Sequence, residues 1–292
     1  MNRFNKIYFN GSSHTAGGGL EIPSKEDESA VWPTKGYKEL GLDVYWKHNK
    51  EVAYPQRISE ELGIEVDNES IQGGSFQRVH RMFYEYFCNN DVTDTLFFLE
   101  YPPGLREEFW STELNDYILV NTDITTHLLL EGPILTGGQR SYESLKYNED
   151  KPKVYEPLKS YYQNLFNPDC KDFFKKEILD YIAIVLFCEQ EKINLIITDF
   201  KDRDLFPFNW LDTKFQSKLM GVLNKKFKYV NFIIHPFVFS KEQNLIIADE
   251  LKGLVAYYRE GKPMPYDDGH VSYTGHIKYG NYVCEKINKW YR

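Results

Sequence analysis

Five short apolar or β-branched runs, each bounded by turn residues, constrain the fold of this chain more than any other feature. They are Ile7–Phe9, Val66–Ile71, Thr95–Leu99, Leu195–Thr198 and Val230–Ile234. Such runs are typical of buried strands of a parallel sheet. Helical patterns lie between them, at Gln56–Leu62, Gln77–Phe87, Phe173–Phe187, Phe215–Phe227 and about Gly275–Trp290. Strands that alternate with helices predict an α/β fold with a mainly parallel sheet and right-handed crossovers.

We expect residues 1–292 to form a single domain, because no internal repeat or low-complexity linker divides the chain. The stretch at about 102–169 is long, aromatic, polar and poorly periodic, with Pro133, Gly137 and Gly138 as breakers. We interpret it as an elaboration of the core, a lid or substrate wall, and not as a separate domain.

Charge and composition exclude several classes of protein. The formal net charge of −8 argues against nucleic-acid binding, which needs a basic face. No apolar run approaches the roughly 20 residues that span a bilayer, and the N-terminus lacks a signal-peptide pattern. The chain is therefore expected to be cytoplasmic at synthesis, as a virion component would also be. The scattered cysteines predict free thiols, and no histidine pair has zinc-site spacing, so we expect no metal and no cofactor.

The loop from Asn10 to Gly19 follows the first apolar run and contains two adjacent serines and three consecutive glycines. Open α/β sheets bind ligands beyond the carboxyl ends of their strands, which is where this loop is expected to lie. A serine there can be exposed as a nucleophile. The alternative is a strand–helix turn with capping serines, since serine and glycine are common turn residues.

A second candidate motif, PYDDGHVSYTGH, lies near the C-terminus at 265–276. Asp267 and His270 are two residues apart, so a turn can bring the carboxylate against the imidazole, as in the supporting half of a catalytic triad. Asp268 is the rival carboxylate. The alternative is a polar turn before the last helix, and His276 is expected in the first turns of that helix.

The third motif is the glycine turn in NESIQGGSFQRVHR, residues 68–81, between a predicted strand and helix. A backbone N–H of Gly73 or Gly74 can face the same crevice and donate to an oxyanion. A tight structural turn is the alternative. Arg78 and Arg81 are expected on a solvated helix face, from which either can reach a substrate.

At these positions the sequence resembles the SGNH hydrolases, also called the GDSL esterase family. Their first block, Gly-Asp-Ser-x-x-x-Gly, is similar to the run Gly11-Ser12-Ser13-His14-Thr15-Ala16-Gly17, in which serine replaces the usual aspartate. The resemblance implies that Ser13 is the nucleophile and an oxyanion donor. It also implies that Asp267 and His270 match the Asp-x-x-His block, and that Gly73, with Gly74 as alternative, supplies the second-block donor.

The family's third block, Gly-x-Asn-Asp, is missing. The third apolar run leads instead into Glu100-Tyr101-Pro102-Pro103-Gly104-Leu105-Arg106, where Tyr101 and Arg106 are the candidates to replace the asparagine. Relatives in bacteriophage genomes and polysaccharide gene clusters resemble this sequence more closely, because they share a Gly-Gly-Ser…Arg second block and lack a standard third one. The fold implied is a three-layer α/β/α sandwich, flavodoxin-like in outline.

The resemblance implies a serine esterase that removes O-acetyl groups from a carbohydrate, with Tyr101, Arg106 and Arg78 contacting substrate. WPTKGY (32–37) and YWKH (45–48) are candidate sugar-stacking walls. Alternatives are a lipid or thioester hydrolase, a metal-dependent hydrolase, a nucleotide-binding protein, and a non-catalytic binding or structural protein such as a virion component. The expected partner is an acetylated polysaccharide, without nucleic acid or membrane, and oligomer or virion assembly is compatible with the sequence.

Overall fold

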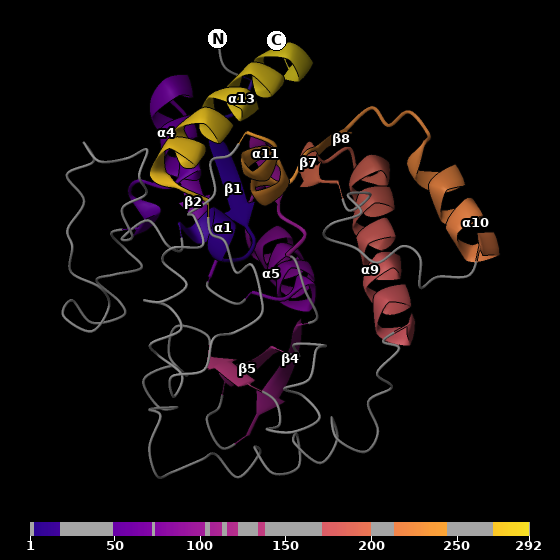
Figure 1. Ribbon diagram of the computed structural model, residues 1–292. Coiled ribbons are helices and arrows are strands. Elements are labelled where there is room, and N and C mark those ends of the chain that lie inside the picture. The colour runs from indigo at the N-terminus through magenta and orange to yellow at the C-terminus, as the bar shows by residue number, and fades with distance from the viewer. Residues whose placement is uncertain are drawn as a thin grey trace, which may run out of the picture.

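The computed structural model describes residues 3–17, 49–71, 74–102, 106–112, 116–121, 134–137, 171–199, 213–243 and 271–291 (Figure 1). Strands and helices alternate along most of this length, as the apolar runs predict. In chain order the elements are β1 (Lys6–Asn10), α1 (Ser13–Ala16), α4 (Tyr54–Leu62), β2 (Glu65–Asn68), α5 (Phe76–Asn89), β3 (Thr95–Leu99), β4 (Arg106–Ser111), β5 (Asp116–Asn121), β6 (Ile134–Gly137), α9 (Lys171–Gln190), β7 (Leu195–Thr198), α10 (Thr213–Leu223), β8 (Val230–Ile233), α11 (Pro236–Glu242) and α13 (Tyr273–Tyr291).

The five predicted strands form one parallel sheet in the order β2-β1-β3-β7-β8. Counted along the chain, this is the order 2-1-3-4-5 of flavodoxin-like sheets. The prediction of an α/β fold with a parallel, flavodoxin-like sheet is therefore confirmed. Because every pairing is parallel, the carboxyl ends of all five strands lie along the same edge.

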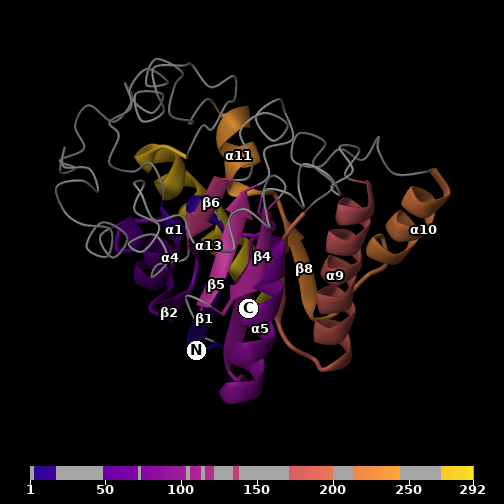
Figure 2. The same ribbon diagram turned by 90° about the horizontal axis from the view of Figure 1, so that it is seen from below.

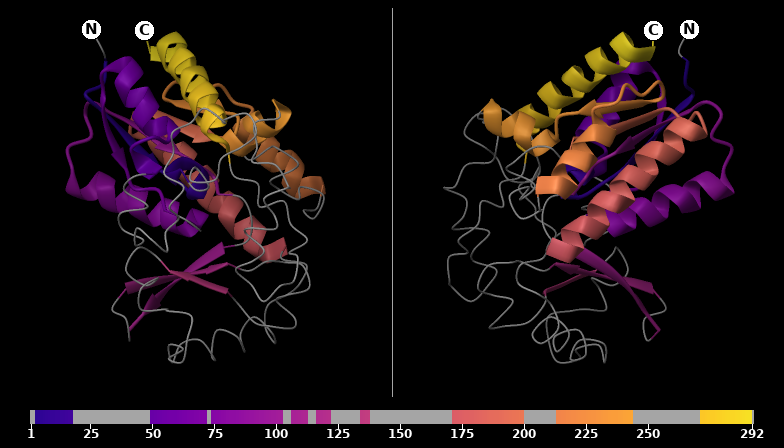
Figure 3. Two further views of the ribbon diagram at one scale, coloured as in Figure 1. Left: turned by 60° about the vertical axis from the view of Figure 1, so that its left-hand side comes forward. Right: turned by 90° about the vertical axis from the view of Figure 1, so that its right-hand side faces the viewer.

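Helices cover both faces of the sheet, which makes the three predicted layers (Figure 3). On one face, Tyr8 and its neighbours pack against α5, α9 and α10. On the other, Ile7 and Phe9 pack against α4, α11 and α13. Successive strand residues point to opposite faces, so one strand feeds both cores. β3 lies between β1 and β7, and all five of its residues are buried.

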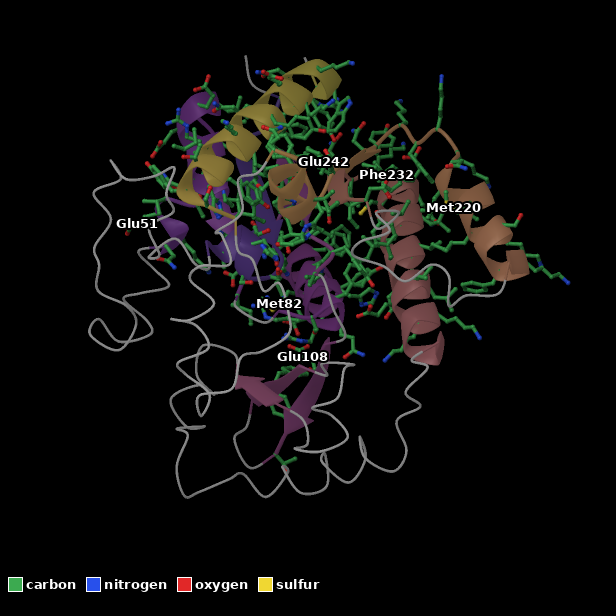
Figure 4. All side chains as sticks on the ribbon, viewed as in Figure 1. Glu51, Met82, Glu108, Met220, Phe232 and Glu242 are labelled. Carbon is green, nitrogen blue, oxygen red and sulfur yellow. The ribbon has the colours of Figure 1, made fainter. Side chains whose placement is uncertain are left out.

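A second, antiparallel sheet of β4, β5 and β6 lies beside α5 (Figure 2). It falls within the stretch that the sequence analysis treated as poorly periodic, and these strands were not predicted. Arg81 of α5 holds it, since Nε and Nη2 each donate to the Glu108 carboxylate over 2.8 Å. The Arg81 guanidinium also lies 3.9 Å from the centre of the Tyr117 ring. Glu108 faces α5 near Met82 in Figure 4. The Arg81 side chain is held between α5 and this sheet and is only 23% exposed, so the expectation that it lies on a solvated helix face is wrong.

Element boundaries follow local hydrogen bonds where they depart from the predicted ranges. β2 ends at Asn68 and not at Ile71, because the Asn68 side chain accepts the Ser70 N–H (3.1 Å) and turns the chain. α4 ends as predicted at Gly63, which adopts the left-handed conformation with φ 64°.

The thiols of Cys88, Cys188 and Cys284 are free, in agreement with the sequence, whereas Cys170 lies outside the described residues. Within the described ranges, no helix is both long enough and apolar enough to cross a membrane.

The end of β1 leaves no room for a side chain at residue 11. A Cβ at Gly11 would lie 2.5 Å from the Glu100 Cβ and 2.9 Å from Thr15 Oγ1. The Gly11 carbonyl also accepts the Ile71 N–H (3.3 Å), which ties the loop after β2 to the loop after β1.

We predict that Gly11→Ala lowers the free energy of unfolding by about 1–3 kcal/mol, because the added methyl overpacks a fully occupied site. The matched control is Gly221→Ala in α10, where a Cβ meets nothing within 4 Å. There alanine should leave stability unchanged or raise it by about 0.5–1 kcal/mol, as expected for a helix interior. Urea unfolding measures both, and equal effects of the two substitutions would contradict the prediction.

Candidate active site

The candidate site lies at the carboxyl ends of β1, β3 and β8. Ser12 and Ser13 follow β1, Glu100 directly follows β3, and His235 follows β8. These loops share the edge at which open α/β sheets bind ligands. The two short helices that begin there, α1 and α11, contact each other.

Ser13 is the first residue of α1. The helix starts here because Ser12, with extended backbone, places its Oγ 3.5 Å from the His14 N–H as an N-cap. It ends at Gly17, whose φ of 82° is a left-handed conformation that favours glycine, and whose N–H donates to the Ser13 carbonyl. The sequence thus forces a single, tightly bounded helical turn with Ser13 at its start.

The two adjacent serines have different environments. Ser12 is fully buried, and its hydroxyl donates a short hydrogen bond to the Glu100 carboxylate. Ser13 retains 4% exposure. The Ser12 hydroxyl therefore shapes the turn, as expected for a capping serine.

Glu100 is the centre of the site, although its side chain is fully buried. Its Oε2 accepts the backbone N–H groups of Ser12 and Thr15, each over 3.1 Å. The hydroxyls of Ser12 and Thr15 also donate to the carboxylate. A fifth donor is His235, whose Nε2 lies 3.1 Å from Oε1.

The hydrogen bonds of His235 fix its tautomer. The backbone N–H of Phe237 donates to His235 Nδ1 over 3.1 Å, so Nδ1 carries a lone pair and no proton. The ring proton is then on Nε2, which donates to Glu100. Both ring nitrogens of His235 therefore have hydrogen-bond partners.

Glu100 is consequently a buried carboxylate that stays ionised. Burial by itself raises the pKa of a carboxyl group, but the hydrogen bonds from His235 and Ser12 hold the pKa of Glu100 well below its usual range.

Three further side chains hold α1 from its other end. Asn49 Nδ2 donates to the Gly17 carbonyl (2.9 Å), and Asn68 Nδ2 to the Thr15 carbonyl (3.3 Å). The hydroxyls of Thr15 and Tyr54 lie 2.8 Å apart. Both ends of this four-residue helix are therefore fixed by side chains from outside it.

Arg78 reaches the end of β1 from the first turn of α5. Its Nη1 donates to Asn10 Oδ1 over 3.0 Å, and Asn10 in turn donates to the Tyr8 hydroxyl. Arg78 is only 8% exposed, so the expectation of a solvated position is wrong. Its predicted contact with substrate stays a prediction.

The glycine turn is only partly described, since Gly73 lies outside the described residues. Gly74 donates its N–H to the Ile71 carbonyl (3.2 Å), and a Cβ there would lie 2.6 Å from the Gly11 oxygen. Gly74 thus serves the close approach of two loops. Its engaged N–H leaves Gly73 as the better candidate for an oxyanion donor.

Tyr101 does not line the site. Its ring is 2% exposed and packs against Phe76, and its hydroxyl donates to buried Glu177 over 2.5 Å. The Tyr101 N–H donates to Thr198 Oγ1 (2.6 Å). The predicted substrate role of Tyr101 is therefore wrong, because the residue belongs to the core. Arg106 is the first residue of β4, and its side chain is not among those that the structure describes.

Asp267 and His270 lie outside the described residues, as do the predicted walls at 32–37 and 45–48. Val271, the first described residue after His270, is buried. Ser272 caps α13 by accepting the Gly275 N–H (3.1 Å).

The start of α13 is joined to α1 through Tyr54. Nδ1 of His276 accepts the Tyr54 N–H (3.1 Å), and the His276 ring stacks on that of Tyr54, whose hydroxyl contacts Thr15. His276 lies in the first turn of α13 as predicted. The start of α13 therefore lies on the side of the sheet edge that α1 occupies.

The sequence analysis missed Glu100, the residue on which the site is centred. A signal existed, because a carboxylate directly after the four apolar residues Leu96–Leu99 of a buried strand must lie at the ligand-binding edge of the sheet. Thr15 and Tyr54 gave no such signal. Within the described ranges, no group of three or more His, Cys, Asp or Glu side chains is placed to hold a metal ion.

No protein-family model and no curated protein matches the sequence. Solved structures similar to it include a lipolytic protein of the G-D-S-L family from Desulfitobacterium hafniense DCB-2, at 11% identity and TM-score 0.38, with 96% of this chain and 98% of that chain covered. An acetylxylan esterase from Geobacillus stearothermophilus gives 14% identity and TM-score 0.33, with 100% and 99% covered.

A carbohydrate esterase family 2 enzyme with a carbohydrate binding domain, from Corynascus thermopiles (Myceliophthora fergusii), gives 10% identity and TM-score 0.42. The match covers 98% of this chain, which spans 66% of the length of that one. Likenesses of this size assign neither an activity nor a substrate to this chain.

The ionised state of Glu100 predicts a pH-dependent stability difference between the protein and its Glu100→Gln variant. The folded-state pKa lies below the unfolded value of about 4.3, so the charge stabilises the fold fully above that pH. This contribution decreases as the pH falls below about 4, toward the folded-state pKa. Urea unfolding should show the largest difference in free energy near neutral pH and a smaller one at pH 3.5. A difference that does not change with pH would contradict the prediction.

Proposed function

We propose that the protein is a serine esterase, with Ser13 as nucleophile, His270 as general base and acid, and Asp267 as the carboxylate that orients His270. The proposal rests chiefly on the geometry of α1. A capped, externally fixed turn at the ligand-binding edge of the sheet begins with Ser13. Both serines are buried, and Ser12 is bonded to Glu100.

The reaction proceeds in two halves. Ser13 Oγ attacks the ester carbonyl while His270 takes the hydroxyl proton, and the tetrahedral intermediate collapses to an acyl-serine. His270 gives its proton to the departing alcohol. His270 then deprotonates a water molecule that attacks the acyl-serine. As this second tetrahedral intermediate collapses, His270 returns the proton to Ser13 Oγ, and the carboxylic acid is released. Asp267 holds the imidazole in the required tautomer throughout.

The oxyanion of each tetrahedral intermediate is stabilised by the backbone N–H groups of Ser13 and Gly73. Loss of one such donor costs about 10²–10³ in rate in other serine hydrolases. After β3, where the SGNH pattern has an asparagine donor, Glu100 is bonded to the α1 loop and Tyr101 to the core. Neither can replace the missing donor, so we expect a slower enzyme or a donor from elsewhere in the chain.

The substrate class that we propose is an O-acetylated carbohydrate. Its support is the likeness of the motifs to those of polysaccharide-associated relatives. Acetylxylan, the substrate named for one of the similar structures, is a suitable first glycan for a screen. We further propose that Arg78 of α5, whose Nη1 donates to Asn10 at the end of β1, contributes a substrate contact.

A second candidate function is a non-catalytic binding or structural role, for example in a virion. The observation that favours it is the missing third block, since Glu100 and Tyr101 both turn out to be structural there.

We predict that Ser13→Ala abolishes hydrolysis of p-nitrophenyl acetate and labelling by a fluorophosphonate probe, with the circular dichroism spectrum unchanged. The matched control is Ser240→Ala in α11. Ser240 is also a buried serine, and its Oγ has no hydrogen-bond partner among the described residues. This control should keep both activity and labelling.

Activity that persists in Ser13→Ala would refute Ser13 as the nucleophile. A folded wild-type protein that neither hydrolyses esters nor reacts with the probe would favour the non-catalytic function.

A further inference from the structure

We propose that Glu100 is a positioning residue for Ser13: its carboxylate caps the nucleophile-bearing turn from a neighbouring strand and replaces the carboxylate that the sequence lacks at position 12. This inference rests on the proposed function and adds a residue to it. The argument depends on three features of the contacts around Glu100.

First, Glu100 satisfies backbone groups that a helix cannot satisfy itself. The first N–H groups of any helix have no partner within it, and an N-cap side chain normally accepts one of them. Here the Thr15 N–H, at the third position of α1, is shared between Glu100 Oε2 at 3.1 Å and the Ser12 carbonyl at 3.2 Å. The N–H of Ser12, which precedes the helix, donates to the same oxygen. Ser13 lies between these two bonded residues.

Second, the site requires a carboxylate and not merely a polar group. Two backbone N–H groups, two hydroxyls and His235 Nε2 all converge on Glu100. An ionised carboxylate has only acceptor sites and offers about four of them, whereas an amide offers one oxygen and turns an NH₂ group toward the remaining donors. Glutamine has nearly the same shape but cannot satisfy this set.

Third, the carboxylate is fixed to the sheet. The Glu100 N–H donates to the Asn10 carbonyl over 2.8 Å, which continues the pairing of β3 with β1. His235 holds the other carboxylate oxygen from the end of β8. The position of α1 relative to the strand ends is therefore set by the Glu100 side chain, and with it the place from which Ser13 Oγ attacks.

A carboxylate at position 12 should therefore be able to take over the role of the one at position 100. Aspartate is among the best N-cap residues, and at position 12 it would accept the same N–H groups of the first turn. Ser12→Asp in the presence of Glu100, however, would place two buried carboxylates in contact, which is unfavourable. Positions 12 and 100 should thus tolerate one carboxylate but not two. The double variant Ser12→Asp/Glu100→Gln should therefore have a higher kcat than either single variant.

The experiment compares Glu100→Gln, Ser12→Asp and the double variant Ser12→Asp/Glu100→Gln. Two properties are measured well below every melting temperature: kcat and KM for p-nitrophenyl acetate, and amide hydrogen exchange in the segment 11–17. We expect Glu100→Gln to lower kcat about 10²-fold with little change in KM, because a displacement of about 1 Å has an effect of that size. Exchange in 11–17 should accelerate. The double variant should recover at least tenfold in kcat, and its exchange should slow again.

The matched control is Glu177→Gln in α9. Glu177 is another buried carboxylate. It accepts a hydrogen bond from the Tyr101 hydroxyl in the core between the sheet and α5 and α9, on the other face of the sheet from α1. This substitution should lower stability but leave kcat and the exchange of 11–17 unchanged. If Glu100→Gln does not fold, Thr15→Val replaces it, because it deletes a single hydroxyl donor to Glu100 and should change both readouts in the same direction, by a smaller factor.

The outcomes separate this inference from the proposed function. A wild-type protein without esterase activity or probe labelling refutes the proposed function, while the exchange measurement still tests whether Glu100 orders the turn. The inference is overturned if Glu100→Gln, or Thr15→Val in its place, leaves the exchange of 11–17 as in the wild type. It is also overturned if Glu177→Gln lowers kcat by as much as Glu100→Gln does, or if the double variant has no higher kcat than Glu100→Gln.

Discussion

A single buried carboxylate determines the arrangement of this sheet edge. An ionised group without water is stable only where donors replace its hydration. Glu100 receives five donors from two other segments of the chain, the turn after β1 and the end of β8. Each donor is consequently restricted in position, since none can leave without exposing a buried charge to an apolar surrounding. Gly11 has no side chain because the carboxylate occupies that space, and α1 is short because both of its ends are fixed.

The parallel sheet was predictable because its strands are buried on both faces and read as short, continuous apolar runs. β3 and β7 have the predicted bounds. β4 was not predictable in this way, because its sequence REEFWS mixes charged and aromatic residues without an apolar period. Its attachment depends on Arg81, a residue whose helical position alone suggested contact with solvent.

The parts of the site that depend on neighbouring residues in the sequence were predictable. The parts formed by contacts between residues far apart in the sequence were not. Capping and glycine patterns in the sequence identify the turn around Ser13, whereas no local pattern indicates that His235 meets Glu100. Tyr101 shows that a residue next to a strand end in the sequence need not line the site. Successive residues point to opposite faces: Leu99 and Tyr101 both enter the core beneath α5 and α9, and Glu100 between them points to the other side, toward α1 and α11.

The contacts of Glu100 also bear on how the chain reaches its native state. Ser12 is 88 positions from Glu100 in the sequence, and His235 is 135 positions from it on the other side. Contacts of such separation form slowly, because much loop entropy is lost before they are gained. During synthesis, α1 and β3 leave the ribosome long before β8 supplies the imidazole that completes the donor set. The turn that carries Ser13 is therefore among the last parts of the molecule to acquire its final form, and a chain that ends before residue 235 cannot complete it.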